Sequence, residues 1–286
     1  MNFNFWVIQT FNGISYGALL FLLGSGLSLI FGVMRIVNLA HGSYFMLGDY
    51  VALSVIWTTG SWVLAIPVAA LTIALLGLAM ERVFLRPLGF DPLRQVLLTV
   101  GFAFLFQQAA LDIWTGNNFD INPPPVLTQS VVVGGIYLPL YRVFMIATAL
   151  VIGLTLWLVM EKTRMGAAVR ATVDDAQMAR GVGVDTSRIS MFIFALGAFL
   201  ATLGGVIGGA FLGVYPGLDF EMLPLAFAVV IIGGMGSLGG AAIGALIVGL
   251  ADNFGKALFP EISYFTLYAP MVLILALKPT GLFGRE

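Results

Sequence analysis

The sequence predicts an all-α, polytopic integral membrane protein with about eight or nine transmembrane helices, some of them broken or re-entrant. Two observations lead to this fold class. Hydrophobic residues make up 60% of the 286 residues and charged residues only 9%, whereas soluble proteins carry roughly 25% charged residues. Apolar runs of about 18 residues or more also recur along the chain, and each is long enough to cross a hydrocarbon core about 30 Å thick.

The same composition excludes several classes of function. A net charge of −1 argues against nucleic-acid binding, which requires a basic surface. The chain has no cysteine, which excludes disulfides, thiol catalysis and cysteine-based metal sites. The first residues, "MNFNFWVIQTFNG", lack the basic region of a cleaved signal peptide, so we interpret them as mature sequence that leads into the first span.

The apolar runs are continuous rather than alternating, which indicates helices, because a helix satisfies its own backbone hydrogen bonds in lipid. The pattern leaves the pair of spans around Gly239 and Gly240 open: two short spans, a broken helix or a re-entrant hairpin. The expected spans are residues 10–33, 38–58, 62–81, 95–115, 139–160, 189–213, 222–238, 241–258 and 263–278.

The positions of Lys and Arg predict the orientation, because cytoplasmic loops collect these residues. The connection 82–94 and the loop 161–188 are rich in them and are expected inside, whereas the loop 116–138 has none and is expected outside. The PPP run of that outer loop indicates an extended, stiff segment. The N-terminus is then outside and the C-terminus inside, with Lys256 as an exception on the outer side. The remaining inner positions are Arg35, Lys278 and Arg285.

The loop 161–188 holds five of the 13 Lys and Arg residues. Good helix formers follow Gly166, and Gly181 and Gly183 suit a helix end. Arg170 and Asp174 are four residues apart and are expected to pair. Two interpretations stay open: a solvated loop that obeys the positive-inside rule, or a short amphipathic helix that docks on a soluble partner. The small residues that give this helix a low profile are Ala167, Ala168, Ala171, Ala176 and Ala179.

The stretch "TRMGAAVRATVDDAQMARGVGVD" resembles the cytoplasmic coupling segment of the Liv-type permeases of branched-chain amino acid ABC transporters. The family pattern is G-x-A-x-R-A, a polar turn, then A-x-x-x-G. The resemblance runs the length of the chain, through "FNGISYGALLFLLGSGLSLIFGVMRIVNLAHGSYFMLGDY", "FALGAFLATLGGVIGG", "VVIIGGMGSLGGAAIGALIVGLADN" and "LKPTGLFGRE". The residues it assigns to coupling are Gly166, Ala168, Arg170, Ala171, Asp174, Ala179 and Gly183.

The resemblance implies a single permease domain, residues 1–286, in the bacterial inner membrane. Its coupling helix would dock on two separate ATP-binding subunits, and its other partners would be a homologous second permease and an extracytoplasmic binding protein. The chain has no G-x-x-x-x-G-K-[ST] loop, so ATP and Mg would be bound by the partners and no cofactor by this chain. The implied cargo is branched-chain or other hydrophobic amino acids, and urea or short-chain amides are the alternative.

Residues 234–239, "GMGSLG", match the G-x-G-x-x-G pattern of dinucleotide sites. No βαβ unit surrounds them, so we interpret the glycines as positions where membrane helices approach closely, with sliding or kinking as a second role. The glycines expected in helix packing are Gly204, Gly205, Gly208, Gly209, Gly236, Gly240 and Gly244.

His41 is the sole histidine and follows Asn38 near the inner end of the second span. Without a second ligand it is a poor metal or acid–base candidate, so we expect a hydrogen bond that fixes a bent helix start, or a part in translocation. Asp49 lies eight residues deeper, about 12 Å along a helix, where a carboxylate usually faces a cavity or a partner. The family more often has a small residue there, and a break at Gly48 would let Asp49 reach water. The candidate pathway residues, each of which could instead bridge helices, are Asn12, Ser15, Asn38, His41, Asp49, Gln107, Gln108 and Asn253.

Two other classes of protein fit the sequence less well. A stand-alone secondary transporter would need coupling-ion ligands and, often, inverted repeats; Asp49 is the one central carboxylate, and no convincing repeat is visible. A membrane enzyme would need a cluster of nucleophile, base or metal ligands, which one histidine and no cysteine make a poor prospect.

Overall fold

The computed structural model describes residues 3–89 and 91–284, and within them the chain is almost entirely helical. The one sheet among these residues is a small antiparallel hairpin. The elements are α1 (Phe3–Met34), α2 (His41–Thr59), α3 (Trp62–Met80), α4 (Pro92–Trp114), β1 (Ser130–Val133), β2 (Ile136–Pro139), α5 (Leu140–Lys162), α6 (Arg164–Asp174), α7 (Ala176–Gly181), α8 (Thr186–Leu212), α9 (Leu218–Gly233), α10 (Leu238–Leu258) and α11 (Ser263–Leu277).

Each of the nine expected spans coincides with a helix, but among the described residues only six helices are long and apolar enough to cross a membrane: α1, α3 with its continuation to Leu88, α4, α5, α8 and α10. Helices α9 and α11 have 16 and 15 residues, or about 24 and 22 Å at 1.5 Å per residue. They are shorter than the hydrocarbon core. The protein is therefore a polytopic membrane protein in which some helices cross the bilayer only in part.

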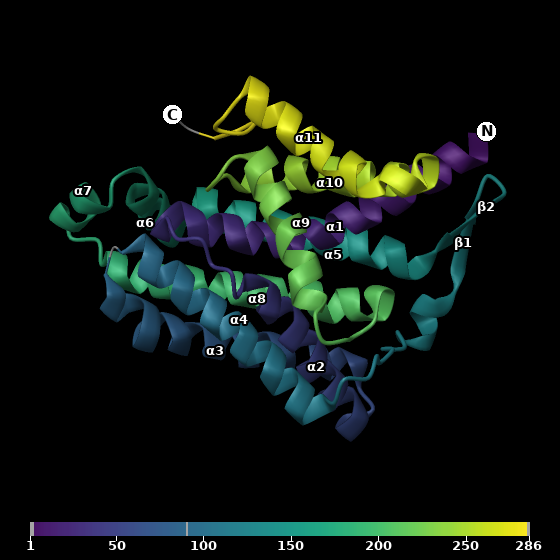
Figure 1. Cartoon of the computed structure of the whole chain (residues 1–286), viewed down its shortest axis with the longest axis horizontal. Coiled ribbons are helices and arrows are strands. Elements are labelled where there is room, and N and C mark those ends of the chain that lie inside the picture. Colours follow the sequence, from purple (N-terminus) through teal and green to yellow (C-terminus); the bar gives the residue numbers. More distant parts are fainter. Residues whose placement is uncertain (1–2, 90, 285–286) are drawn as a thin grey trace.

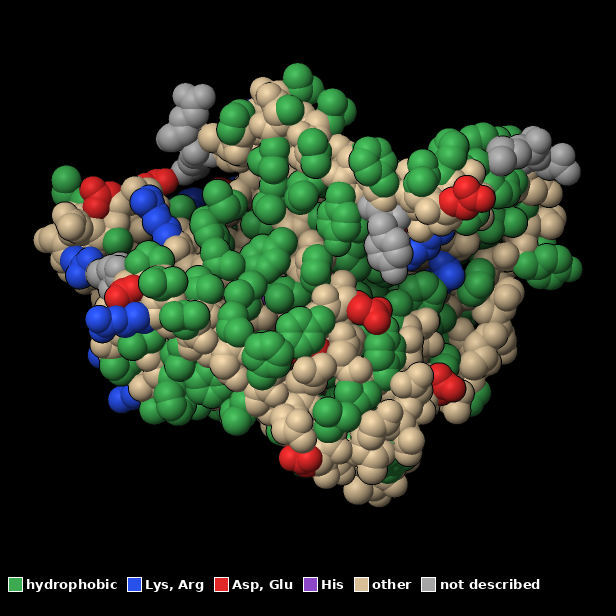
Figure 2. All heavy atoms as spheres, viewed as in Figure 1, with side chains coloured by type: hydrophobic (Ala, Val, Ile, Leu, Met, Phe, Trp, Pro, Cys, Tyr) green, Lys and Arg blue, Asp and Glu red, His purple; other side chains and the backbone are tan. Residues whose placement is uncertain are grey.

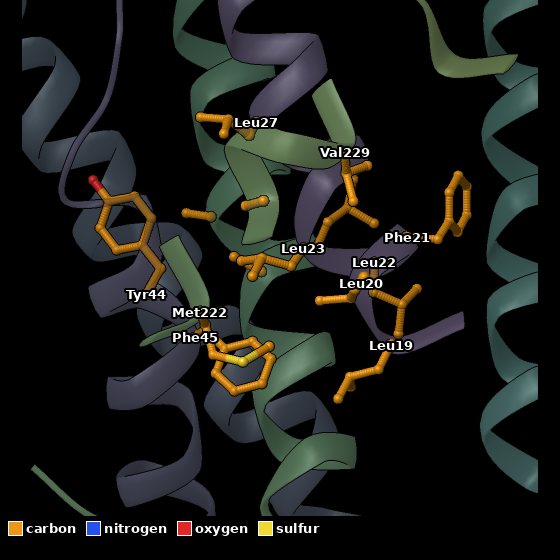
Figure 3. Close-up of a cluster of buried hydrophobic side chains, with 14 of the residues drawn as sticks. Leu19, Leu20, Phe21, Leu22, Leu23, Leu27, Tyr44, Phe45, Met222 and Val229 are labelled. Atoms are coloured by element: carbon orange, nitrogen blue, oxygen red, sulfur yellow. The ribbon is translucent and has the colours of Figure 1, made fainter. Parts of the chain in front are cut away.

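Helix α1 lies at the centre of the bundle. It packs against α10 and α8, and also against α5 and α9. In Figure 1, α9 runs across the direction of α1, α8 and α10, while α6 and α7 lie at one end of the molecule and the β1–β2 hairpin at the other. Figure 3 shows the core that results: leucines of α1 are clustered with Tyr44 and Phe45 of α2 and with Met222 and Val229 of α9.

Glycines allow these helices to approach closely. Gly205 of α8 lies against the backbone carbonyl of Phe45 in α2, and Gly244 of α10 lies against the backbone carbonyl of Val229 in α9, so neither position has room for a Cβ atom. Small residues at helix contacts replace the hydrophobic driving force that lipid does not supply. The other glycines named from the sequence also lie against neighbouring elements: Gly204, Gly208, Gly209, Gly236 and Gly240.

The "GMGSLG" stretch forms the tight turn between α9 and α10. Gly234 and Gly236 have φ angles of 98° and 80°, which are in the left-handed region that glycine adopts without strain. The Ser237 hydroxyl then caps α10 by accepting a hydrogen bond from the Gly240 N–H at 3.0 Å. The two segments around Gly239 are thus separate helices joined by a turn.

The outer loop is more structured than its PPP run indicates. A 3₁₀ turn at Pro125–Thr128 leads into the hairpin, whose register runs from Ser130 opposite Pro139 to Val133 opposite Ile136. Gly134 and Gly135 form its turn with positive φ angles of 57° and 81°. The sequence "SVVVGGIYLP" could have predicted this hairpin, because two glycines between two β-branched or aromatic runs are typical of a hairpin.

Candidate coupling and translocation sites

Helix α6 is fixed to the end of α5. The Thr163 hydroxyl caps α6 by accepting a hydrogen bond from the Gly166 N–H at 3.1 Å. Gly166 itself lies so close to the Met160 carbonyl that a Cβ atom would collide with it. The Arg170 guanidinium donates to the same carbonyl and lies 3.7 Å from the Glu161 carboxylate. These two motif residues therefore hold α6 in position against the end of α5.

The segment expected as one helix divides into two at Asp175. This residue is extended, with φ −153° and ψ 104°, and its carboxylate accepts hydrogen bonds from the N–H groups of Gln177 and Met178 at 2.8 and 2.9 Å. Aspartate is a strong helix N-cap, so it ends α6 and starts α7. The hydrogen bonds from Met178 and Gln177 hold the pKa of the Asp175 carboxyl below its usual value.

The residues assigned to coupling differ in exposure. Gly166 and Ala179 are buried, and Ala168, Arg170 and Ala171 are half-buried, whereas Asp174 and Gly183 are exposed. The apolar side chains most exposed on the α6–α7 segment are Met178 and Val182, at 67% and 74%, and Met165 of α6 is 40% exposed. Figure 2 shows that Lys and Arg side chains gather at the end that carries α6 and α7. A partner would thus meet apolar side chains surrounded by charges.

A cleft of about 230 Å³ lies between this segment, the C-terminal continuation of α3 and the start of α8. Thr172 of α6 and Ala176 of α7 line it together with Glu81, Arg86 and Ser190. The Glu81 carboxylate lies 3.5 Å from the Arg86 guanidinium, in a π-helical turn, Glu81–Leu85, that continues α3. Any movement of α6 and α7 will therefore change the surroundings of the end of α3 and the start of α8.

Asn38 and His41 lie deeper than the sequence indicated. Both are buried, and the His41 Nε2 atom lies 3.0 Å from the Leu23 carbonyl oxygen. Leu23 is 11 residues from the end of α1 at Met34, about 16 Å along the helix. His41 is the first residue of α2, as expected, and it makes a hydrogen bond at the start of that helix. It lies deeper in the bundle than expected, because residues 35–40 are not helical and lead into the bundle before α2 begins.

Asp49 is fully buried, and α2 continues through Gly48 without a break. The alternative in which Asp49 reaches water is therefore wrong. Its carboxylate lies against Gly209 of α8, three residues before that helix ends at Leu212. Asp49 thus lies near the C-terminal end of α8.

The two glutamines have different surroundings. Gln108 is exposed and donates a hydrogen bond to the Asp112 carboxylate at 2.9 Å. Gln107 is half-buried and faces the Gly217 turn before α9. Asp219, in the first turn of α9, was not predicted; it is buried and accepts a hydrogen bond from the Ser43 hydroxyl at 2.9 Å. The sequence feature that could have predicted this position is "GLDFE" at the start of an apolar run, because acidic residues favour a helix N-terminus.

Asn12 and Ser15 lie in the N-terminal half of α1, and Asn253 lies in the C-terminal half of α10. A further polar group near them was not predicted from the sequence. The Ser15 hydroxyl donates to the Asn12 carbonyl at 2.9 Å. Arg142, in the first turn of α5, donates to the Ser15 hydroxyl at 3.4 Å. Arg142 lies at the start of α5, the end expected outside, so under the predicted orientation Lys256 is not the single cation on that side.

The eight candidate pathway residues therefore do not form one site. The structure places them in a group on α1 and α10, a pair at the start of α2, Asp49 against α8, and two positions on α4. No group of three or more His, Cys, Asp or Glu side chains within the described ranges could hold a metal ion.

The fold and these contacts define a multi-pass membrane protein with a helical segment at one end and polar groups within its bundle. Comparison with known proteins gives the family. Residues 9–275 match the model of the branched-chain amino acid transport system permease component, and the chain belongs to this family. No solved structure matches the chain.

Three relatives illustrate the likeness. The chain is 32% identical to the high-affinity branched-chain amino acid transport system permease protein LivH of Escherichia coli, over 99% of this chain and 97% of LivH. It is 28% identical to the corresponding protein BraD of Pseudomonas aeruginosa, over 97% of this chain and 95% of BraD. The permease protein LivM of Escherichia coli is 28% identical, over 91% of this chain and 67% of LivM.

Proposed function

We propose that the chain is the transmembrane permease subunit of an ATP-driven importer for branched-chain or other hydrophobic amino acids. The observation that carries the proposal is the α6–α7 segment. It is fixed to α5 through Gly166 and Arg170, it borders the cleft at the inner ends of the spans, and it exposes Met178 and Val182. A segment with these properties is suited to receive movement from a soluble partner.

The partners follow from this role. ATP and Mg would be bound by two separate ATP-binding subunits that contact α6 and α7 on the cytoplasmic side. A second, homologous permease would complete the pathway, since LivH and LivM are both relatives of this chain. An extracytoplasmic binding protein would deliver the cargo at the opposite end. The chain is thus a single permease domain in a bacterial inner membrane, with its N-terminus outside and its C-terminus in the cytoplasm.

The cargo is inferred from the relatives LivH and BraD, which are branched-chain amino acid permeases. Uptake of labelled leucine in cells with and without the chain, in competition with isoleucine, valine, phenylalanine, urea and acetamide, tests this. Loss of leucine uptake on deletion, with competition by the apolar amino acids alone, is the expected result. Unchanged leucine uptake with loss of urea or acetamide uptake would show that the cargo is urea or a short-chain amide. The proposed architecture would still hold.

Copurification tests the ATP-driven class separately. Gentle solubilisation of the tagged chain should bring ATP-binding subunits with it in stoichiometric amount. A chain that transports in liposomes without any such subunit would be a secondary transporter, and the proposal would then be wrong.

A further inference from the structure

The end of α3 is joined to the start of α8 through the side chain of Arg86. Its Nη2 atom donates a hydrogen bond to the Ser187 carbonyl oxygen at 2.9 Å, and its Nε atom lies 3.5 Å from the Glu81 carboxylate. Ser187 is in the first turn of α8, which begins at Thr186, and Glu81 directly follows α3. Arg86 therefore bridges the two helices through two different nitrogen atoms.

A π-helical turn brings Glu81 and Arg86 to the same side of the chain. In a regular α-helix of 3.6 residues per turn, side chains five residues apart point about 140° away from one another. In the π-helical turn Glu81–Leu85, the Arg86 N–H instead bonds to the Glu81 carbonyl, five residues back. Such turns within helices are frequent at functional sites. The turn thus allows the Arg86 side chain to contact both Glu81 and α8.

The Glu81 carboxylate is poorly placed to stabilise the fold. Its side chain is only 3% exposed, and its Oε2 atom has no hydrogen-bond partner within the described part of the chain. A buried carboxylate with one partner at this distance is costly, and replacement of a buried ion pair by apolar side chains is often neutral or stabilising. The pair is therefore better explained by the elements that it connects than by a contribution to stability.

The bridge borders the α6–α7 segment. Glu81, Arg86 and Ser187 line the cleft of about 230 Å³, and Thr172 of α6 and Ala176 of α7 line the same cleft. The bridge is thus at the place where movement of the α6–α7 segment would first reach the long helices.

The two bridged helices differ in how they are connected to this segment. Helix α7 ends at Gly181 and α8 begins at Thr186, so the chain itself carries movement of α7 into α8. Helix α3 has no such covalent connection. It packs alongside α8 (Figure 1), with Gly77 against the Ala198 side chain farther along, and its end is held to α8 through Arg86.

We propose that Arg86 is a positioning residue that makes the end of α3 move together with α8 when the α6–α7 segment moves. Glu81 holds the guanidinium in place, and the Ser187 carbonyl is its contact on α8. Without the bridge, α8 still follows α7 but the end of α3 does not, so ATP is hydrolysed with less cargo moved. This inference rests on the proposed function and adds the residues that carry movement from the α6–α7 segment into the spans.

The first test uses the complete importer, reconstituted in liposomes with its binding protein, and measures L-leucine transported per ATP hydrolysed. In Arg86→Lys the positive charge stays, but a single nitrogen atom cannot make both contacts. In Glu81→Gln/Arg86→Met both charges are removed, so that no buried carboxylate is left unpaired to destabilise the chain. Arg82→Met is the matched control, because Arg82 is exposed on the same π-helical turn and forms no ion pair with a described residue.

Both bridge variants should lower leucine transported per ATP by about 10-fold or more, the effect expected for a hydrogen bond that involves a charged group. The ATPase rate and the thermal unfolding temperature should stay near the wild-type values, since the α6–α7 segment and the core are unchanged. Arg82→Met should transport within about 2-fold of the wild type, as surface changes usually do.

Spin labels measure the movement itself, because the chain has no cysteine and two can be introduced. Val83→Cys and Arg188→Cys place labels at exposed positions beside the bridge, one on each helix. With the bridge intact, the distance between the labels should be the same with and without a non-hydrolysable ATP analogue, because the two helices move together. In Glu81→Gln/Arg86→Met the analogue should shift this distance or broaden its distribution.

Several results would contradict the inference. Normal transport per ATP in both bridge variants, or an unchanged label distance in Glu81→Gln/Arg86→Met, would show that α3 follows α8 without Arg86. Normal transport in Arg86→Lys alone would assign the effect to the charge rather than to the bridge. Loss of thermal stability and of the ATPase rate in both bridge variants would assign Arg86 to structure. A wild-type importer that moves leucine without ATP hydrolysis would overturn the proposed function instead, and this is seen before any variant is compared.

Discussion

The carboxylate of Asp49 on α2 occupies the space that a side chain at Gly209 on α8 would need. Asp49 is fully buried, so it cannot move aside into water. Gly209→Ala should therefore force the two helices apart and lower the free energy of unfolding by about 1–3 kcal/mol, as overpacking of a core does. Thermal unfolding of the purified protein in detergent measures this.

The double variant Asp49→Ala/Gly209→Ala is the control. Removal of the carboxylate frees the space, so the loss in the double variant should be smaller than the sum of the two single losses. If the two losses in unfolding free energy simply add, the two side-chain positions do not interact, and this contact does not contribute to stability.

Gly166 and Arg170 should be required for transport but not for insertion into the membrane. Gly166→Val places methyl groups against the Met160 carbonyl, and Arg170→Glu places a second carboxylate beside Glu161 in place of the cation. Both should displace α6 from α5 and reduce leucine uptake by about 10-fold or more, the effect of a loss of some 1–3 kcal/mol at this contact. Uptake is measured against the amount of chain in isolated membranes.

Ala167 provides the matched control for this contact. It is exposed on the same helix, next to Gly166, so Ala167→Val adds similar bulk away from α5 and should leave uptake near the wild-type value. Normal uptake in both Gly166→Val and Arg170→Glu would exclude α6 from the transport cycle.

Met178 and Val182 should carry the contact with the ATP-binding subunits. Both are apolar and exposed, and apolar anchors dominate the energy of most protein interfaces. Met178→Asp and Val182→Asp should each reduce the ATP-binding subunit that copurifies by about 10-fold, which corresponds to about 1.4 kcal/mol. Val126→Asp, at a position 70% exposed in the outer loop, should retain it. Equal retention in all three variants would exclude this surface as the docking site.

Much of the fold could be predicted from apolar runs alone, and the reason is physical. A continuous apolar run in lipid has few alternatives to a helix, so all nine expected segments coincide with helices. Their depth could not be predicted in the same way. The position of His41 depends on the six nonhelical residues before it, and its contact with the Leu23 carbonyl joins elements 18 residues apart.

The candidate sites were predictable where a local pattern dictates a contact. Gly166 and the packing glycines are such cases, because a close approach excludes any larger side chain. Asp219 was missed because it lies before the expected span 222–238, whereas Arg142 lies within the expected span 139–160 and was not singled out. Their hydrogen-bond partners, Ser15 and Ser43, are 127 and 176 residues away in the chain. No local sequence pattern could therefore predict these two contacts.

The cap of α7 should make the α6–α7 segment sensitive to low pH. The N–H groups of Gln177 and Met178 hold the pKa of Asp175 below its unfolded value, so the carboxylate stabilises α7 at any pH above that unfolded value. The stabilisation is lost as the pH falls through the folded pKa, because a protonated carboxyl accepts these hydrogen bonds poorly. Amide hydrogen exchange of residues 176–181, measured between about pH 3 and pH 7 after correction for the intrinsic rate, should show protection that decreases toward the acid end. Asp175→Asn keeps a capping oxygen without the charge, and its protection should be lower at neutral pH and independent of pH. A wild-type profile that is equally flat would mean that the carboxylate contributes nothing to α7.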